Sequence, residues 1–333
     1  MTPYVANLLI FCCIYGVLAM SLDLLIGETG VFSAAHAVFF AVGAYSVAIV
    51  QEHWTQNFLV VVVVAVIAAG VIGAAFALSA VRSREITFIV ASLAFGVVFD
   101  QILNAWIPVT GGEGGLSGIL GPSIFGHSLN SQNGMITLAV VALVIVVAIR
   151  WHIERSRFGL RMRAIREDET AAISLGSHTA VVKASAVIVS SMLASLGGVV
   201  YAYYVAFISP ASFDSSESVL LAAMVVIGGL GRVFGPIVGA ALLTVLPSLL
   251  NFLPIPPADL GPLEQMIYGA AVVAVMMTEP GGIAALSEKV YHQSVRVTRA
   301  LLSHQTPPRP TAGAVGSDGA EPDPAPSGTG TRN

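Results

Sequence analysis

The sequence predicts an all-α integral membrane protein, a polytopic helical bundle of about eight to ten transmembrane helices, some of them broken or re-entrant. Of the 333 residues, 56% are hydrophobic and 10% are charged, whereas soluble domains carry about 25% charged residues. Residues 58–81 and 184–210 contain no Asp, Glu, Lys or Arg, and a membrane-crossing helix needs about 20 mainly apolar residues. Such stretches recur along most of the chain, which excludes the buried helices of a large soluble domain. The net charge of −4 and the scarcity of basic residues indicate no nucleic-acid partner.

Nine apolar segments are the expected spans, in chain order residues 5–26, 31–50, 58–81, 86–107, 135–150, 183–208, 217–230, 234–251 and 263–278. The first lacks the basic region of a cleaved signal peptide, so we expect it to remain as a span. Its adjacent Cys12 and Cys13 cannot form a disulfide framework and have no metal-ligand spacing. The stretch 27–31 is either a turn or a re-entrant break. Segment 217–230 is short for a full crossing and is expected to be a tilted half-helix or part of a re-entrant element.

Basic residues orient these spans, because Lys and Arg accumulate on the cytoplasmic side of a membrane. Seven of the 15 lie between Arg150 and Lys183. If that loop is inside, alternation of the spans leaves loops 51–57, 108–134, 209–216 and 252–262 outside, and these contain no Lys or Arg. We therefore expect a multi-pass protein of the bacterial cytoplasmic (inner) membrane, surrounded by lipid. Its N-terminus is outside unless residues 27–31 are re-entrant.

Composition divides the chain into two parts. Residues 1–302 are the expected transmembrane domain, which includes a cytoplasmic loop at 152–182. Residues 303–333 are rich in Pro, Gly, Ala and Ser with almost no large apolar residues. Such a segment cannot bury enough surface to offset its ordering entropy, so we expect a disordered C-terminal tail.

Motifs for catalysis are missing from the sequence. A phosphate-binding P-loop requires G-x-x-x-x-G-K-[ST], and neither Lys183 nor Lys289 has that context. No H-E-x-x-H, C-x-x-C or G-x-S-x-G motif occurs, and the seven histidines are scattered. We expect no catalytic residue, no metal site and no cofactor bound by this chain. Any ATP must be hydrolysed by another protein.

The loop 152–182 has the pattern of a short amphipathic helix. Met162, Ile165, Ala172 and Leu175 recur at three- and seven-residue steps, which places them along one helical face with Glu169. Arg163 and Glu167 are four residues apart and are expected to pair on the exposed side. Gly176 is expected to end the helix in a left-handed conformation. The pattern fits either a helix that docks on a partner or a solvated loop that satisfies the positive-inside rule.

The same loop resembles a known family. Glu169, Thr170, Ala171 and Ala172, followed by Gly176, resemble the "EAA" coupling loop of ABC importer permeases, and RAIREDETAAISLG is close to its form in branched-chain amino-acid permeases. The resemblance extends from about residue 21 to 282 through SLDLLIGETGVFSAAHAVFFAVGAY, ITFIVASLAFG, TGGEGGL and MVVIGGLGRVFGPIVGAALL, in the expected order. It is greatest to the M-type of the two permease subunits in the leucine/isoleucine/valine importer.

This resemblance implies a transmembrane subunit that imports branched-chain or related amino acids. Its partners would be a second permease in a heterodimer, two cytoplasmic ATP-binding subunits that hold ATP and Mg, and an extracytoplasmic solute-binding protein. The resemblance implies that the loop enters a cleft of an ATP-binding subunit with six coupling residues: Arg163, Arg166, Glu169, Ala171, Ala172 and Gly176.

Ionisable groups within a bilayer are costly and normally face a protein interior or an aqueous cavity. Asp23 and Asp100 are therefore candidates to pair with a substrate ammonium, with structural pairing as the alternative. Exposed amides at a helix break between Gly27 and Gly30 would favour a substrate carboxylate. Three further polar side chains would add hydrogen bonds to substrate or between helices: Ser33, His36 and Asn104.

Gly231, Gly235 and Gly239 form two overlapping G-x-x-x-G patterns, for which close helix packing is favoured over a gate. Several functions stay open. The same architecture would serve for urea, a short amide or another small solute. An ATP-independent channel or secondary transporter would not need the loop at 155–176, and a membrane receptor or scaffold would not need Asp residues within the membrane.

Overall fold

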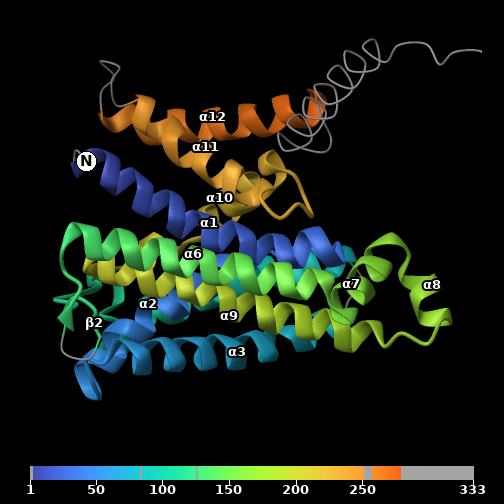
Figure 1. Ribbon diagram of the computed structural model, residues 1–333, viewed down its shortest axis with the longest axis horizontal. Coiled ribbons are helices and arrows are strands. Elements are labelled where there is room, and N and C mark those ends of the chain that lie inside the picture. The colour runs from blue at the N-terminus through green and yellow to red at the C-terminus, as the bar shows by residue number, and fades with distance from the viewer. Residues whose placement is uncertain (1–2, 83–84, 125–126, 251–256, 279–333) are drawn as a thin grey trace, which may run out of the picture. The chain divides into compact units, whose positions relative to one another are not determined.

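The computed structural model describes residues 3–82, 85–124, 127–250 and 257–278, which fold as a bundle of α-helices (Figure 1). The nine expected spans correspond to nine helices: α1 (Pro3–Thr29), α2 (His36–His53), α3 (Phe58–Arg82), α4 (Glu85–Ala105), α6 (Gln132–Arg155), α9 (Thr179–Val205), α10 (Ser215–Gly228), α11 (Gly235–Leu250) and α12 (Pro257–Thr278). Six helical stretches are long and apolar enough to cross a membrane. The all-α polytopic fold is confirmed. The expected tail 303–333 and the domain boundary at 302 lie outside the described residues.

Shorter elements connect these helices. They are α5 (Ile107–Thr110), α7 (Arg157–Glu167), α8 (Glu169–Ser174), the 3-10 helices η1 (Gly112–Gly114) and η2 (Pro210–Phe213), and the strands β1 (Leu116–Ser117), β2 (Ser123–Ile124), β3 (His127–Ser128) and β4 (Phe207–Ile208). The strands form two antiparallel pairs, β1 with β4 and β2 with β3.

The long helices run between two ends of the bundle. At one end, Gln132 donates a hydrogen bond to the Pro3 carbonyl, and Gln51 donates one to the Leu120 carbonyl. At the other end, α7 and α8 contact α1, α6 and α9 (Figure 1). We call residues 157–176 the elbow, and the two ends the elbow end and the opposite end.

Two antiparallel helices of equal length, α1 and α9, lie at the centre of the bundle. Ser190 Oγ donates a 2.6 Å hydrogen bond to the Ser21 carbonyl, and the rings of Phe11 and Tyr201 meet nearer the opposite end. A serine hydroxyl in an apolar environment needs a hydrogen-bond partner, and a partner on a neighbouring helix also holds the two helices together. Five of the other long helices pack against this pair: α2, α3, α6, α10 and α11.

After α1 the chain turns back through an irregular segment. Gly30 has a φ of 74°, which ends α1, and residues 30–35 are not helical. α2 then begins beside Ser21, whose hydroxyl lies 2.7 Å from His36 Nε2, so the chain has turned back along α1. Hydroxyls satisfy the freed amides, with Ser92 Oγ accepting from Ala34 N at 2.9 Å. Gln51, in the last turn of α2, lies at the opposite end, so α1 and α2 return the chain to the side of its N-terminus.

A second break follows α9. Ala206, with a φ of 56°, ends α9 as Gly30 ends α1. After β4 and η2, α10 begins next to the middle of α1, where Tyr15 approaches Glu217, and runs toward the elbow end. Together with η2, the stretch Pro210–Gly228 is long and apolar enough to cross a membrane, so the interpretation of segment 217–230 as a half-helix or part of a re-entrant element stays a prediction.

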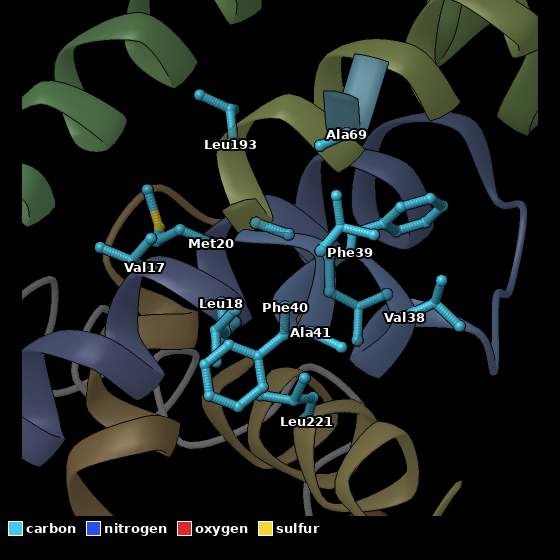
Figure 2. Packing of buried hydrophobic residues seen from close by; sticks show 14 of the residues in the cluster. Val17, Leu18, Met20, Val38, Phe39, Phe40, Ala41, Ala69, Leu193 and Leu221 are labelled. Atoms are coloured by element: carbon cyan, nitrogen blue, oxygen red, sulfur yellow. The ribbon is translucent and has the colours of Figure 1, made fainter. Parts of the chain in front are cut away.

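Close contacts at glycines and the packing of buried hydrophobic side chains, which Figure 2 shows, hold the inner helices together. A Cβ added at Gly198 of α9 would lie 2.8 Å from Ala44 N of α2, so the two backbones touch. Aliphatic and aromatic side chains fill the rest, among them Val17, Leu18 and Met20 of α1, Phe39 and Phe40 of α2, Ala69 of α3, Leu193 of α9 and Leu221 of α10. Such close contact between helices drives association where lipid is as apolar as the side chains.

Candidate functional site

The elbow consists of two short helices rather than one. The Ser156 hydroxyl caps α7 by accepting from the amides of Phe158 and Gly159 at 3.2 and 3.3 Å. Asp168 ends α7 in an extended conformation, and its carboxylate caps α8 by accepting from Thr170 N and Ala171 N at 2.8 and 3.0 Å. The prediction of one continuous helical face was wrong here, because Asp168 starts a new helix with its own axis.

The new axis changes which side chains face inward. Met162, Ile165 and Ala172 are buried against the chain itself, but Leu175 is 87% exposed. The prediction that Leu175 shares one helical face with Met162, Ile165 and Ala172 was therefore wrong. Gly176 has a φ of 81°, and the amides of Gly176 and Ser177 bond to the carbonyls of Ile173 and Ala172. This is a Schellman motif, and the expectation that Gly176 ends the helix is confirmed.

A buried ionic cluster lies directly beneath the elbow. Arg150, near the end of α6, forms a 2.6 Å ion pair with Asp23 of α1, and both side chains are fully buried. The same guanidinium contacts Glu28 at 3.4 Å and the Met20 carbonyl at 3.5 Å. Removing such charges from water is expensive, and they persist because each has partners of opposite sign or hydrogen bonds.

The elbow contributes two further arginines to this cluster. Arg163 of α7 reaches Glu28 at 4.0 Å and Glu154 at 3.6 Å, and it donates to the Glu154 carbonyl at 2.9 Å. These contacts differ from the expected pairing with Glu167, since Arg163 turns toward α6 and α1. Arg166 donates to the carbonyl of Gly27 in α1.

The α10–α11 connection closes the cluster. Gly231, with a φ of 73°, donates its amide to Asp23 Oδ1 at 2.9 Å. A Cβ added at Gly27 would lie 2.5 Å from Gly231 N and 2.8 Å from Asp23 Cγ, so Gly27 permits this approach. We call Asp23, Glu28, Arg150, Arg163 and Arg166 the ionic cluster. It connects the elbow to α1, α6 and the α10–α11 connection.

The elbow also pairs with α9. Lys183 Nζ lies 2.6 Å from Glu169 Oε1, which joins the first turn of α8 to the first turns of α9. A polar pocket of about 190 Å³ lies beside this pair and is lined by Thr29, Gly30, Arg166 and Lys183, among others. Glu169 therefore has a partner within the chain as well as an exposed face.

The candidate pathway residues separate into three places. Asp23 belongs to the ionic cluster, and Gly27, which is still helical, lies beside it in α1. Ser33 and His36 are buried at the turn between α1 and α2, and the Ser33 hydroxyl accepts from Ala35 N at 3.4 Å. Asp100 and Asn104 lie on α4, where Asn104 Nδ2 is 3.2 Å from Asp100 Oδ1. The structure does not bring the two aspartates together, and their role toward a substrate stays a prediction.

The three glycines of the G-x-x-x-G patterns have different surroundings. A Cβ at Gly235 would lie 2.8 Å from the Gly228 carbonyl oxygen, and one at Gly239 would lie 2.8 Å from Gly228 N. Both therefore lie where α10 and α11 approach each other. Gly231 precedes α11 and contacts Gly27 and Arg166 instead.

Sequence reasoning missed Arg150 and Glu28 as members of the site. Arg150 was used only to orient the spans, although it ends an apolar segment and carries a charge that needs a partner. Glu28 is the nearest acidic residue to Asp23 in the same apolar region. A search for a partner of opposite charge for each ionisable residue near the end of a span would have identified both residues.

The fold and the site together define a class of protein, a multi-pass permease of a membrane transport system. The chain belongs to the family described as branched-chain amino acid transport system / permease component, whose model matches residues 4–277. The high-affinity branched-chain amino acid transport system permease protein LivM of Escherichia coli (strain K12) is 28% identical over 297 residues, or 82% of this chain and 68% of that protein. The LivM protein of Salmonella typhimurium has the same identity and coverage.

A second kind of relative matches a smaller part of the chain. The autoinducer 2 import system permease protein LsrC of Yersinia pseudotuberculosis is 30% identical over 121 residues, which are 35% of this chain and 34% of that protein. No solved structure matches the chain.

Proposed function

We propose that this chain is the transmembrane subunit of an ATP-driven importer for branched-chain or related amino acids in the bacterial inner membrane. It works with a second permease, two ATP-binding subunits and an extracytoplasmic binding protein. The elbow receives the movement of an ATP-binding subunit and passes it to the helices. The chain itself hydrolyses nothing.

The exposed apolar surface of α8 is the observation that carries this proposal. Ile173 is 55% exposed and Leu175 is 87% exposed, and Leu175 lines one pocket with exposed Val181 and charged Arg161. The elbow contains too many charges to lie in the hydrocarbon of a membrane. Apolar side chains that are exposed among charges support a protein partner at α8, because contiguous apolar patches of this kind mark interaction sites.

The ionic cluster supports the transmission of movement. Arg163 and Arg166 attach α7 to α1, and Lys183 attaches α8 to α9. α1 and α9 are the central helices of the bundle. A force on α8 would therefore act on both without passing through a flexible linker.

The relatives favour leucine, isoleucine or valine as the first substrates to test. The LivM relatives align over 82% of this chain, whereas the first autoinducer 2 relative aligns over 35%. Urea, a short amide or another small solute remains the alternative cargo, and an ATP-independent channel is the alternative mechanism. Uptake of leucine, urea and a short amide by the same vesicles distinguishes the cargoes, and uptake with and without enclosed ATP distinguishes the mechanisms.

The test uses the complex co-expressed from the neighbouring genes and reconstituted in proteoliposomes with radiolabelled leucine. Wild type should accumulate leucine only with enclosed ATP. Glu169→Lys should abolish uptake while the chain still inserts in the membrane. The double variant Glu169→Lys with Lys183→Glu restores the internal ion pair but keeps the reversed charge on α8.

The double variant decides between two roles of Glu169. Continued loss of uptake supports a contact between Glu169 and the ATP-binding subunit. Full recovery would show that the pair with Lys183 is all that matters, and the coupling role of Glu169 would be rejected. Leucine accumulation by the chain without its partners would reject the ATP-driven function altogether.

A further inference from the structure

One side of α4 is left uncovered by the rest of the chain. Among the six described stretches that could cross a membrane, α4 is the least buried, with 17% of its apolar window covered. Six exposed residues recur at helical spacing along this side, and we call them the outer face of α4: Val90, Ala94, Val97, Val98, Gln101 and Ala105.

The other side of α4 packs against the bundle. Ser92 and Leu103 are buried there, and the Ser92 hydroxyl accepts from Ala34 N in the turn between α1 and α2 at 2.9 Å. A Cβ added at Gly96 would lie 3.9 Å from Ser215 Oγ at the start of α10. The bundle therefore holds α4 from one side, and the outer face points away from it.

Polar side chains lie on and beside the outer face, inside the span. Gln101 is exposed, and the neighbouring Asp100 is partly exposed, with its Oδ1 accepting from Asn104 Nδ2 at 3.2 Å. Both lie four or five residues before α4 ends at Ala105, which is about 6–8 Å along the helix axis. The next residue, Trp106, is exposed and is of the type that marks the membrane interface. The carboxyl and amide groups therefore lie deeper than the interface.

The exposed sides of α3 and α6 differ from the outer face of α4. In the middle of these two helices the large exposed side chains are apolar: Val63, Ile67 and Val71 on α3, and Val144, Ile145 and Ile149 on α6. Lipid is a suitable surrounding for both. An acid or amide that faces hydrocarbon is costly, and such groups normally face protein or water. Asp100 and Gln101 therefore favour a protein, rather than lipid, against the outer face of α4.

We propose that the outer face of α4 binds the second permease, through a helix that places a hydrogen-bond donor or a cation opposite Asp100 and Gln101. This inference rests on the proposed function and assigns its permease partner a surface. The partner is a different chain and not a second copy, because a symmetric pair would bring two Asp100 carboxyl groups to the same depth on facing helices. A copy would also supply no cation there, since every Lys and Arg in the described ranges lies at the elbow end or in the elbow.

Photo-crosslinking in the purified, reconstituted complex tests this surface directly. Benzoylphenylalanine in place of Val97 should crosslink this chain to an epitope-tagged second permease, which the tag and the mass of the product identify. The same side chain in place of Ile67 on α3 or Val144 on α6 should give no such product, because lipid covers those positions. A crosslink from Val97 to lipid or to a second copy, with none to the second permease, would overturn the proposal.

Co-purification of the tagged second permease measures the contribution of the outer face to assembly. Ala94→Trp adds bulk at the contact and should lower the co-purified fraction at least about threefold, whereas Ala74→Trp, at an exposed alanine of α3, should leave it unchanged. Gln101→Leu should lower it about threefold, the effect of one lost hydrogen bond between membrane helices. If lipid covered the face, Gln101→Leu would bind the second permease as well as wild type does.

The isolated chain provides the control for folding. Because the outer face contacts nothing in this chain, Ala94→Trp and Gln101→Leu should unfold at the wild-type temperature in detergent. Undiminished co-purification by either variant would overturn the proposal, and so would a loss that follows a lowered unfolding temperature, because that result indicates a structural role. Failure of the wild-type chain to bind any second permease would instead contradict the proposed function.

Discussion

Arg150, near the end of α6, combines complete burial with contacts to two acidic side chains and a carbonyl. Burial of an ion pair is not by itself stabilising, because desolvation offsets much of the attraction. Removing one member is different, since the remaining charge is then buried without compensation. The contribution of the ionic cluster to stability is therefore tested by replacing one of its members and measuring unfolding.

We expect Arg150→Met to destabilise the protein by about 3–5 kcal/mol, because Asp23 and Glu28 lose their shared cation. Thermal unfolding of the detergent-solubilised chain measures the change. The control is Arg155→Met, one turn further along α6, whose guanidinium is exposed and stacks over Trp151 at 3.8 Å. The free energy of unfolding of Arg155→Met should be lower than that of wild type by no more than about 1 kcal/mol. Equal losses in the two variants would contradict a structural role for the ionic cluster.

Gly27→Ala tests the close approach between α1 and the α10–α11 connection. The added methyl group would overlap Gly231 N at 2.5 Å, so Gly231 must move and its hydrogen bond to Asp23 must weaken. We expect a loss of about 1–3 kcal/mol, as for other overpacked positions, and faster amide hydrogen exchange at Gly231. Gly114→Ala, where no atom lies within 4 Å, should unfold at the wild-type temperature. An unchanged exchange rate at Gly231 in Gly27→Ala would reject this contact.

At the scale of elements, the sequence predicted which segments are helices better than where α2 and the elbow begin and end. Long apolar runs suffice to locate helices, since each of the nine expected segments contains one, and six helical stretches among the described residues are long and apolar enough to cross a membrane. α2 begins five residues later than expected. The sequence from Val31 to Ala35 is mainly apolar, so its hydropathy does not distinguish it from the helix that follows. The irregular backbone of this segment is stabilised by distant hydroxyls such as Ser92. The pairing of Arg150 with Asp23 likewise joins residues far apart in the chain, which no local pattern reveals.

The break at Asp168 has a local cause, and it is testable. We expect Asp168→Ala to destabilise the start of α8 by about 1 kcal/mol, because two amides lose their acceptor. Hydrogen exchange at Thr170 and Ala171 in lipid nanodiscs should accelerate several-fold. Glu167→Ala changes an exposed acidic neighbour that accepts no hydrogen bond from α8, and exchange there should stay at the wild-type rate. Acceleration of the same size in both variants would show that Asp168 is not the cap.

At the scale of the whole molecule, charge separates the two ends of the bundle. Every Lys and Arg in the described ranges lies at the elbow end or in the elbow: Arg82, Arg150, Arg155, Arg157, Arg161, Arg163, Arg166, Lys183 and Arg232. The opposite end carries acidic residues such as Glu52 and Glu113. Between the ends, exposed side chains such as Val63, Ile67 and Val71 of α3 are apolar. This distribution matches a bilayer around the middle and the cytoplasm at the elbow.

Cysteine labelling tests that orientation in a background with Cys12→Ser and Cys13→Ala. Glu52→Cys and Glu113→Cys should react with a membrane-impermeant maleimide in right-side-out vesicles, because both positions are exposed at the opposite end. Arg157→Cys and Ser174→Cys, exposed on the elbow, should react only in inverted vesicles. The buried control Val17→Cys should react in neither. If Glu52→Cys and Arg157→Cys react from the same side, the helix order described here is wrong. If the two sets are exchanged, the helix order stands, but the elbow faces away from the ATP of the cytoplasm and cannot couple to it.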